Sequence, residues 1–270
     1  MNTTEIMQLA LDMAGFDRIP ADSEIYVEGD GIKKVLFGID IDSSDLYYAK
    51  ANGYDAVIAH HPQACVISSY EVYRDHVKIM KRFGVPEEAA VKAVEGRCQE
   101  MRISNHMKNY DDTVSVARML NMPFLNIHQP LDDIGRRLMQ EKVDEVLSNE
   151  NATLKDVVAA LSSFREIKAA RTKVELLMGD ENQKPGRTVV AHGAYTNGGY
   201  DVANTYFEHG VNTVIYIHIP YSEYARLKKE AKGNLIVTGH IASDSIGINP
   251  FVEALRKRGL EVVTIKGIIG

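Results

Sequence analysis

The stretch that decides the fold is "GYDAVIAHHPQ", residues 53–63, in which an apolar run of strand length ends in two histidines and a proline. Residues 33–41, "KKVLFGIDI", have the composition of a buried strand, and residues 43–53 that of a helix capped by Ser43 or Ser44. This strand–helix–strand order predicts a parallel pair with a right-handed crossover.

The second part of the chain repeats this order. "RTVVAHG" (187–193) predicts a strand, "TNGGYDVANTYFEHG" (196–210) a glycine turn and a helix, and "VNTVIYIHIP" (211–220) another apolar strand. When Gly53 is aligned with Gly210, His61 coincides with His218. The sequence therefore predicts an α/β fold of two similar lobes with mainly parallel sheets. Between two such lobes, a cleft forms where the carboxyl ends of strands meet.

The segment between the two repeats is mostly helical in pattern. We expect helices over 71–100, with a break at 84–86, and a short strand at 101–106. The polar, turn-rich residues 178–187 mark the expected boundary between lobes. The predicted division is a first lobe at 1–180, with a helical insertion, and a second lobe at 181–270.

The composition is that of a soluble globular protein and argues against several other classes. The 270 residues are 45% hydrophobic and 25% charged, which is ordinary for a soluble globular protein. The net charge of −6 disfavours a nucleic-acid partner, which normally needs a basic patch. The N-terminal stretch lacks the features of a signal peptide, and no apolar run approaches the roughly 18 residues of a membrane span. Two cysteines without a paired motif favour a reduced, cytoplasmic protein.

Three groups of histidine and aspartate each follow a predicted strand. They are His60–His61, the loop with His106, Asp111 and Asp112, and the pair His240 and Asp244 at i and i+4. Each group has a plain structural explanation: satisfied histidines, a helix cap at Asp111 or Asp112, and a chance spacing. Because all three groups follow strands, we expect their side chains to lie at one edge of the sheet. Imidazoles and carboxylates without cysteine suit zinc, manganese, iron, cobalt or nickel.

Three segments of the chain resemble those of a known family. "GIDIDSSDLYYAKANGYDAVIAHHP" (38–62), "HMKNYD" (106–111) and "TGHIASD" (238–244) resemble the NGG-one-interacting factor three-like family, also described as GTP cyclohydrolase I type-two homologues. The resemblance implies a two-lobed α/β fold, a dinuclear metal centre between the lobes, and a homo-oligomer, most often a hexamer. The implied metal ligands are His60, His61, Asp111, His240 and Asp244.

The chain departs from the family pattern in four places. The family usually has glutamate at the position of Asp244, and its loop motif runs His-Thr-Asn-Leu-Asp without the extra residue after His106. The region after Pro62 is unusually long and helical, and "IHIP" (217–220) replaces a Thr-Gly-acid sequence.

The remaining histidines and Cys65 have weaker signals. His192 and His218 follow strands and are candidates for the same cleft, whereas His76, His128 and His209 are expected on the surface or in loops. Cys65 is expected to be a small buried residue.

Two functions fit these signals. The first is a metal-dependent hydrolase with two divalent ions per chain, acting on a small phosphorylated or heterocyclic, nucleotide-like molecule. GTP ring opening is suggested by the family label alone. The second is a non-catalytic metal-binding protein that regulates or scaffolds protein partners.

Overall fold

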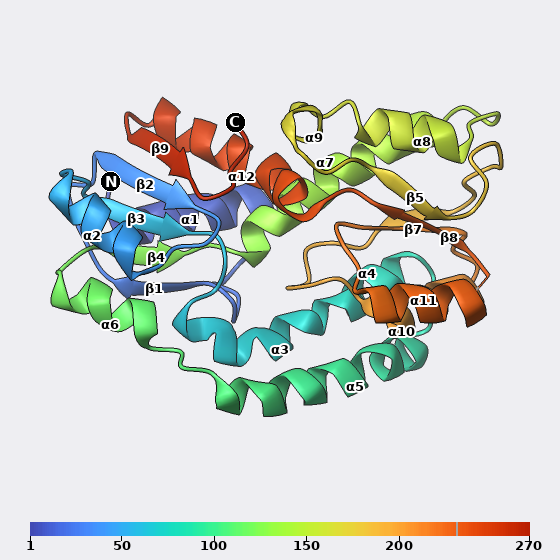
Figure 1. Cartoon of the computed structure of the whole chain (residues 1–270), viewed down its shortest axis with the longest axis horizontal. Coiled ribbons are helices and arrows are strands. Elements are labelled where there is room, and N and C mark those ends of the chain that lie inside the picture. The colour runs from blue at the N-terminus through green and yellow to red at the C-terminus, as the bar shows by residue number, and fades with distance from the viewer. Residues whose placement is uncertain (231) are drawn as a thin grey trace.

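The computed structural model describes every residue of the chain except residue 231. Within that part, the strands form two separate sheets (Figure 1). The first sheet has the order β1-β4-β3-β2-β9 and the second the order β5-β8-β7-β6. The strands are β1 (Glu24–Val27), β2 (Lys34–Gly38), β3 (Ala56–Ala59), β4 (Phe124–Asn126), β5 (Glu175–Met178), β6 (Thr188–Val190), β7 (Thr213–Tyr216), β8 (Asn234–Val237) and β9 (Glu261–Ile265).

Helices cover both faces of each sheet. The α-helices are α1 (Thr3–Ala14), α2 (Ser43–Ala51), α3 (Ser69–Tyr73), α4 (Asp75–Arg82), α5 (Glu87–Ser104), α6 (Asp112–Met119), α7 (Gln129–Leu147), α8 (Leu154–Leu161), α9 (Arg165–Ala169), α10 (Gly199–Glu208), α11 (Tyr221–Glu230) and α12 (His240–Lys257). Short 3-10 turns, η1 (Ala64–Ser68) and η2 (Asn105–Met107), flank the α3–α5 segment. None of the described helices is both long and apolar enough to span a membrane.

The predicted α/β fold with mainly parallel sheets is confirmed. β2 and β3 pair in parallel, with Val35 opposite Ala56 and Gly38 opposite Ala59. Side chains alternate along β2, so Val35 and Phe37 enter one core and Leu36 the other. Only the edge strands β1 and β5 run antiparallel to their neighbours, β4 and β8, among the described strands.

The internal repeat extends further than the sequence comparison suggested. The order β1-β4-β3-β2 of the first sheet is matched by β5-β8-β7-β6 in the second. β4 therefore corresponds to β8, and the helix after each, α7 and α12, leaves the same end of its sheet. Equivalent positions in the two lobes thus follow equivalent strands.

The boundary expected near residue 180 does not separate the two sheets. β5 precedes it and belongs to the second sheet, while β9 follows it and pairs in parallel with β2 of the first. The chain crosses to the second lobe along α7 and returns along α12. The pairing of β9 with β2 is a long-range contact that local sequence pattern does not encode.

The strand predicted at 101–106 is also wrong. These residues are the last turn of α5 followed by η2. The buried residues of α5 keep the helical period through this segment. They are Ala90, Ala93, Val94, Cys98 and Met101.

The segment from α3 to α5 is the helical insertion that the sequence indicated. It starts beside the first sheet and runs across to the second lobe, where Met80, Ala90 and Val94 pack in one core with Val214 of β7 (Figure 1). The insertion therefore braces the two lobes along one side.

The two lobes are joined most closely where α7 crosses α12. Leu131 of α7 belongs to the first-lobe core and Met139 to the second-lobe core, and α12 likewise contributes to both. A Cβ atom on Gly247 would lie 2.0 Å from the carbonyl oxygen of Leu131, and one on Gly135 would lie 3.2 Å from the Gly247 nitrogen. Glycine at both positions is what allows the helices to touch backbone to backbone.

We predict that Gly247→Ala separates α7 from α12, because the clash is with backbone that cannot rotate away. Overpacking of this kind costs about 3 kcal/mol. The melting temperature should fall by roughly 6–12 °C. Gly96→Ala in α5 is the matched control, since its Cβ would meet nothing within 4 Å. This exposed helical substitution should leave the protein as stable or raise stability by up to about 1 kcal/mol. Equal melting temperatures for the two variants would contradict the close-crossing argument.

Candidate metal centre

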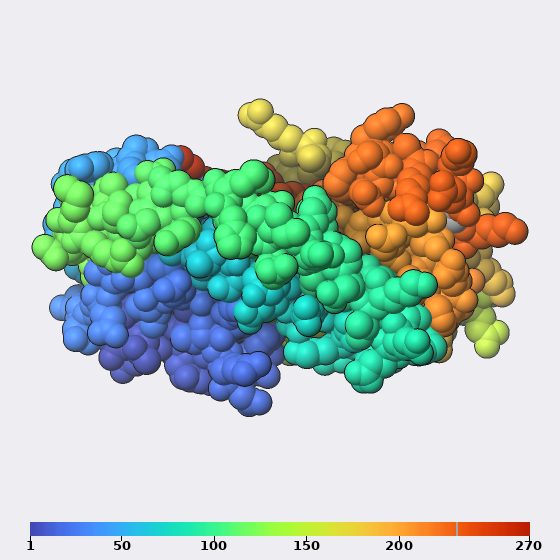
Figure 2. Space-filling model, turned by 90° about the horizontal axis from the view of Figure 1, so that it is seen from below, coloured from blue at the N-terminus to red at the C-terminus, as the bar shows by residue number. Residues whose placement is uncertain are grey.

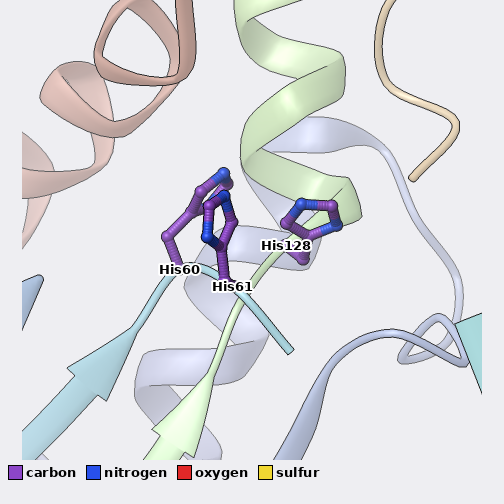
Figure 3. A group of neighbouring side chains, drawn as sticks. All are labelled: His60, His61 and His128. Carbon is purple, nitrogen blue, oxygen red and sulfur yellow. The ribbon is translucent and has the colours of Figure 1, made fainter. Parts of the chain in front are cut away.

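His60 and His61 extend from the carboxyl end of β3, as the sequence predicted. The backbone N–H groups of His60 and His61 donate to the carbonyls of Gly38 and Ile39, each at 2.9 Å. These bonds continue the ladder with β2 beyond the strand and fix the direction of both residues. Figure 3 shows their rings rising from the end of β3 beside His128, which lies at the start of α7.

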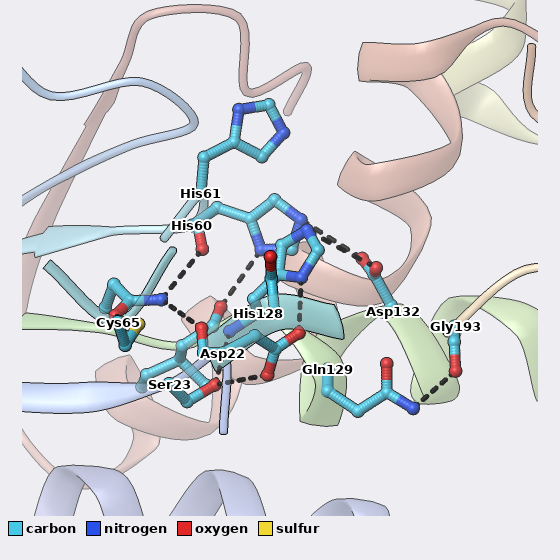
Figure 4. Close-up of polar contacts among 12 residues, drawn as sticks. Asp22, Ser23, His60, His61, Cys65, His128, Gln129, Asp132 and Gly193 are labelled. Atoms are coloured by element: carbon cyan, nitrogen blue, oxygen red, sulfur yellow. Dashed lines mark hydrogen bonds and ion pairs between the residues drawn. The ribbon is translucent and has the colours of Figure 1, made fainter. Parts of the chain in front are cut away.

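Each of these three imidazoles is oriented through its Nδ1 atom. His60 Nδ1 lies 3.0 Å from the carbonyl oxygen of Ile127, His61 Nδ1 lies 2.7 Å from Asp40, and His128 Nδ1 lies 2.7 Å from Asp22. A backbone carbonyl can only accept, so the proton of neutral His60 is on Nδ1. Such partners free Nε2 as the ligand atom and increase its basicity. The contacts of His60 and His128 are drawn in Figure 4.

Two carboxylates come from the crossing helices. Asp132 of α7 places Oδ1 3.1 Å from His60 Nε2, and its Oδ2 lies 3.6 Å from His128 Nε2. Asp244 of α12 places Oδ2 3.3 Å from His240 Nε2 and 3.7 Å from His61 Nε2. Asp244 is 2% exposed and reaches the imidazoles although it is shorter than the family's usual glutamate. The close approach at Gly247, one helical turn further on, draws this part of α12 inward.

Several polar atoms in this cluster are buried without a hydrogen-bonding partner. His60 Nε2, Asp132 Oδ1, Asp244 Oδ2 and His192 Nε2 are all in this state. Buried polar atoms in native proteins are nearly always satisfied, so orphans that converge on one place indicate a missing partner. Imidazole nitrogens facing carboxylate oxygens are the donor set of a divalent transition metal. The residues present therefore fit a metal ion.

The cluster divides into overlapping groups of ligand atoms that lie within 4.8 Å of one another. The groups are His60–His61–His128, His61–His240–Asp244 and His60–Asp132–Asp244. One end, around His60 and Asp132, is buried, whereas the side chain of His240 is 43% exposed. The cluster is thus closed inside the protein and open at the His240 end.

The charges of the cluster stabilise one another. Burial alone would raise the pKa of Asp132, but the neighbouring imidazoles of His128, His192 and His60 hold it below its usual range. Burial alone would lower the pKa of His61, but the carboxylates of Asp244 and Asp40 outweigh it and raise the pKa to about 10. Without metal, His61 therefore carries a proton at neutral pH.

The structure does not bring Asp111 into this cluster. Its side chain is 47% exposed and its Oδ1 lies 2.8 Å from the guanidinium of Arg118. His106 is also exposed, on η2. The carboxylate that lies beside His60 in the cluster is instead Asp132, and it is accompanied by His128, which we expected in a loop or on the surface.

Two sequence signals could have identified His128 and Asp132. "HQPLD" (128–132) has the spacing of the family's His-Thr-Asn-Leu-Asp motif without an extra residue. In addition, "HQPLDDIG" (128–135) and "HIASDSIG" (240–247) share histidine, aspartate, isoleucine and glycine at the same spacing. The repeat thus pairs His128 with His240, Asp132 with Asp244, and Gly135 with Gly247.

Of the other histidines, two reach the cluster from the second lobe. His192 Nε2 lies 3.6 Å from Asp132 Oδ1, and the His218 ring centroid lies 4.8 Å from that of His240. His76, expected near the surface, is fully buried and donates from Nε2 to the carbonyl of Thr196 at 2.8 Å. Cys65 is buried, as expected, and hydrogen-bonds with Tyr26.

The chain is similar to several proteins of known structure. A NIF3 superfamily protein from Sphaerobacter thermophilus is 46% identical, with a TM-score of 0.96, over 99% of this chain and 98% of that one. Reduced HcgD from Methanocaldococcus jannaschii is 15% identical, with a TM-score of 0.60, over 98% of this chain and 97% of that one. A Bacillus cereus protein related to NIF3 is 11% identical, with a TM-score of 0.50, over 98% of this chain and 96% of that one. The last two likenesses concern the fold alone. No family model and no curated protein sequence matches the chain.

We predict that metal-free protein loses stability between pH 7 and about pH 10. The pKa of His61 is raised in the folded state above its unfolded value near 6.5. Its contribution is therefore complete below about pH 6.5 and is lost as the pH rises through the folded value. Melting temperatures of the wild type and of His61→Gln, each measured from pH 6 to 10.5, should converge as the pH rises. Parallel curves would show that His61 is not protonated as described.

Proposed function

This chain belongs to the NIF3 superfamily, and on that premise we propose that it binds two divalent metal ions and hydrolyses a small phosphorylated or heterocyclic substrate. The observation that carries the proposal is the convergence of buried, unpartnered imidazole and carboxylate atoms at the lobe interface. Hydrogen bonds within the protein leave these atoms unsatisfied, so a bound cation is their natural complement.

The proposed ligands come from the end of β3 and from the two crossing helices. His60, His128 and Asp132 would hold the inner ion, and His61, His240 and Asp244 the outer one. Each set joins two imidazoles to one carboxylate, which suits zinc, manganese, iron, cobalt or nickel. When bound, such a pair of ions lowers the pKa of a water molecule and polarises a phosphoryl or carbonyl oxygen.

Several residues support hydrolysis in preference to a purely structural role. A structural metal site is normally closed by protein ligands, whereas the exposed edge of His240 leaves room for water and substrate. Asp22 and Asp40 hold the imidazoles of His128 and His61 in place, so their Nε2 atoms need no reorientation on binding. His192 and His218 line the second-lobe side and provide imidazoles for proton transfer.

The first test is metal content. Wild-type protein purified without chelator should carry about two equivalents of metal, and Asp132→Asn should reduce this to about one or less, because the inner ion loses its carboxylate. Asp111→Asn is the matched control, since this carboxylate pairs with Arg118 outside the cluster. Elemental analysis of the three proteins measures the outcome. Equal loading of wild type and Asp132→Asn, or loss of metal in Asp111→Asn, would return the ligand assignment to Asp111.

The second test is activity. Phosphomonoesters, cyclic amides and GTP should be assayed with zinc, manganese, iron and cobalt. Turnover should appear with at least one pairing and fall to the background rate in a His60→Ala/His240→Ala double variant, which removes one imidazole from each proposed ion. His106→Ala, at an exposed position, serves as the control. If wild type carries both ions and every pairing is silent, a non-catalytic metal-binding protein becomes the better description.

A further inference from the structure

A polar cavity of about 570 Å³ lies between the helical insertion and the second lobe. Gly96, Arg97 and Glu100 of α5 form one wall, and Asn197, His218 and Ser222 of the second lobe stand opposite. Beside the cavity, α5 packs against α10 in one core, and in Figure 2 the green and orange surfaces of these segments adjoin. A volume of this size accommodates a small metabolite such as a mononucleotide.

The cavity adjoins the open end of the metal cluster through His218. The His218 ring packs edge-on against His240, with centroids 4.8 Å apart. Its Nδ1 lies 3.0 Å from Asn197 Nδ2, an amide nitrogen that can only donate. His218 therefore accepts at Nδ1 and carries its proton on Nε2. A molecule bound at the exposed edge of His240 can extend past His218 into the cavity.

The charged groups of the cavity wall already have partners. Arg97 pairs with Glu100 at 2.7 Å, Glu223 accepts from the backbone N–H of Tyr200 at 2.8 Å, and Asp201 lies 3.7 Å from Arg226. The neutral hydrogen-bonding groups of the lining are Asn197, Ser222 and His218, and the Asn197 amide already bonds to His218 and to the Gly199 N–H. The lining holds one arginine and three carboxylates, so it disfavours an anionic group and suits an uncharged one rich in hydroxyls or amides.

The two walls lie far apart in sequence, since α5 ends at Ser104 and His218 follows β7. The fold brings them together beside the candidate metal cluster.

Building on the proposed function, we infer that this cavity binds the sugar or nucleoside body of a phosphate ester whose phosphate lies at the metal cluster. The cluster would supply the charge that binds the phosphate. The cavity would supply the hydrogen bonds that bind the uncharged remainder of the ester. The substrate class is therefore a sugar phosphate or a nucleoside monophosphate. The helical insertion and the second lobe would determine substrate specificity, and the cluster would carry out the hydrolysis.

The test compares three probes by calorimetric titration into zinc-loaded protein: inorganic phosphate, ribose 5-phosphate and guanosine 5′-monophosphate. Gly96→Trp places a large side chain in the cavity, because a Cβ at this position meets nothing within 4 Å. Gly96→Ala is the matched control. Ser222→Trp fills the cavity from the opposite wall and replaces the first variant if that one does not fold.

At least one ester should bind wild type and Gly96→Ala about tenfold more tightly than inorganic phosphate. This advantage should vanish in Gly96→Trp or Ser222→Trp, while zinc content and the affinity for inorganic phosphate stay unchanged. The inference is overturned if neither ester exceeds inorganic phosphate in zinc-loaded wild type, or if the advantage survives both tryptophan variants. If the wild-type protein takes up no zinc, the proposed function itself is overturned. Failure of the cavity inference and failure of the proposed function are therefore distinguishable.

Discussion

The backbone contact between Gly135 and Gly247 is the constraint on which the rest of the structure depends. Each glycine lies one helical turn after an aspartate of the metal cluster, Asp132 on α7 and Asp244 on α12. With any larger side chain at the crossing, the helices would stand further apart and carry the two carboxylates away from the imidazoles. The cluster is therefore a product of helix packing as much as of its ligand residues. Both helices also enter both lobe cores, so one contact sets the lobe interface and the site together.

Because so many polar groups of the site are buried together, the surrounding residues must supply hydrogen bonds to them. Asp22 is fully buried, and its carboxylate accepts from the hydroxyl of Ser23 and bonds to His128 (Figure 4). Asn126 links Tyr26, Cys65 and the Asp22 carbonyl. These bonds and the Nδ1 contacts satisfy one side of the imidazoles, while His60 Nε2, Asp132 Oδ1 and Asp244 Oδ2 have no partner. The division between satisfied and unsatisfied atoms is what distinguishes a binding site from a defect in the core.

Local pattern was enough to predict β2, α2, β3 and the histidine pair after them, since each is encoded by neighbouring residues. His240 and Asp244 were found for the same reason, because their spacing is helical. His128 and Asp132 escaped notice because β4 is three residues long, too short for a periodic signal, and because "HMKNYD" offered a rival motif. In the fold, Asp111 lies at the surface outside the cluster, where Arg118 pairs with it. The place of β9 beside β2 could not be predicted, since strand partners distant in sequence leave no local trace.

The return of the chain to the first sheet through β9 has a mechanical consequence. The second lobe is an excursion of the chain that leaves along α7 and comes back along α12, and both chain ends stay with the first lobe. Any hinge motion between the lobes must flex those two helices and shift the α3–α5 insertion, and the same two helices hold the carboxylates. A change in the angle between the lobes would consequently also change the distances between these carboxylates and the imidazoles. A molecule bound between the lobes and a cation bound at the cluster would therefore each alter the affinity for the other.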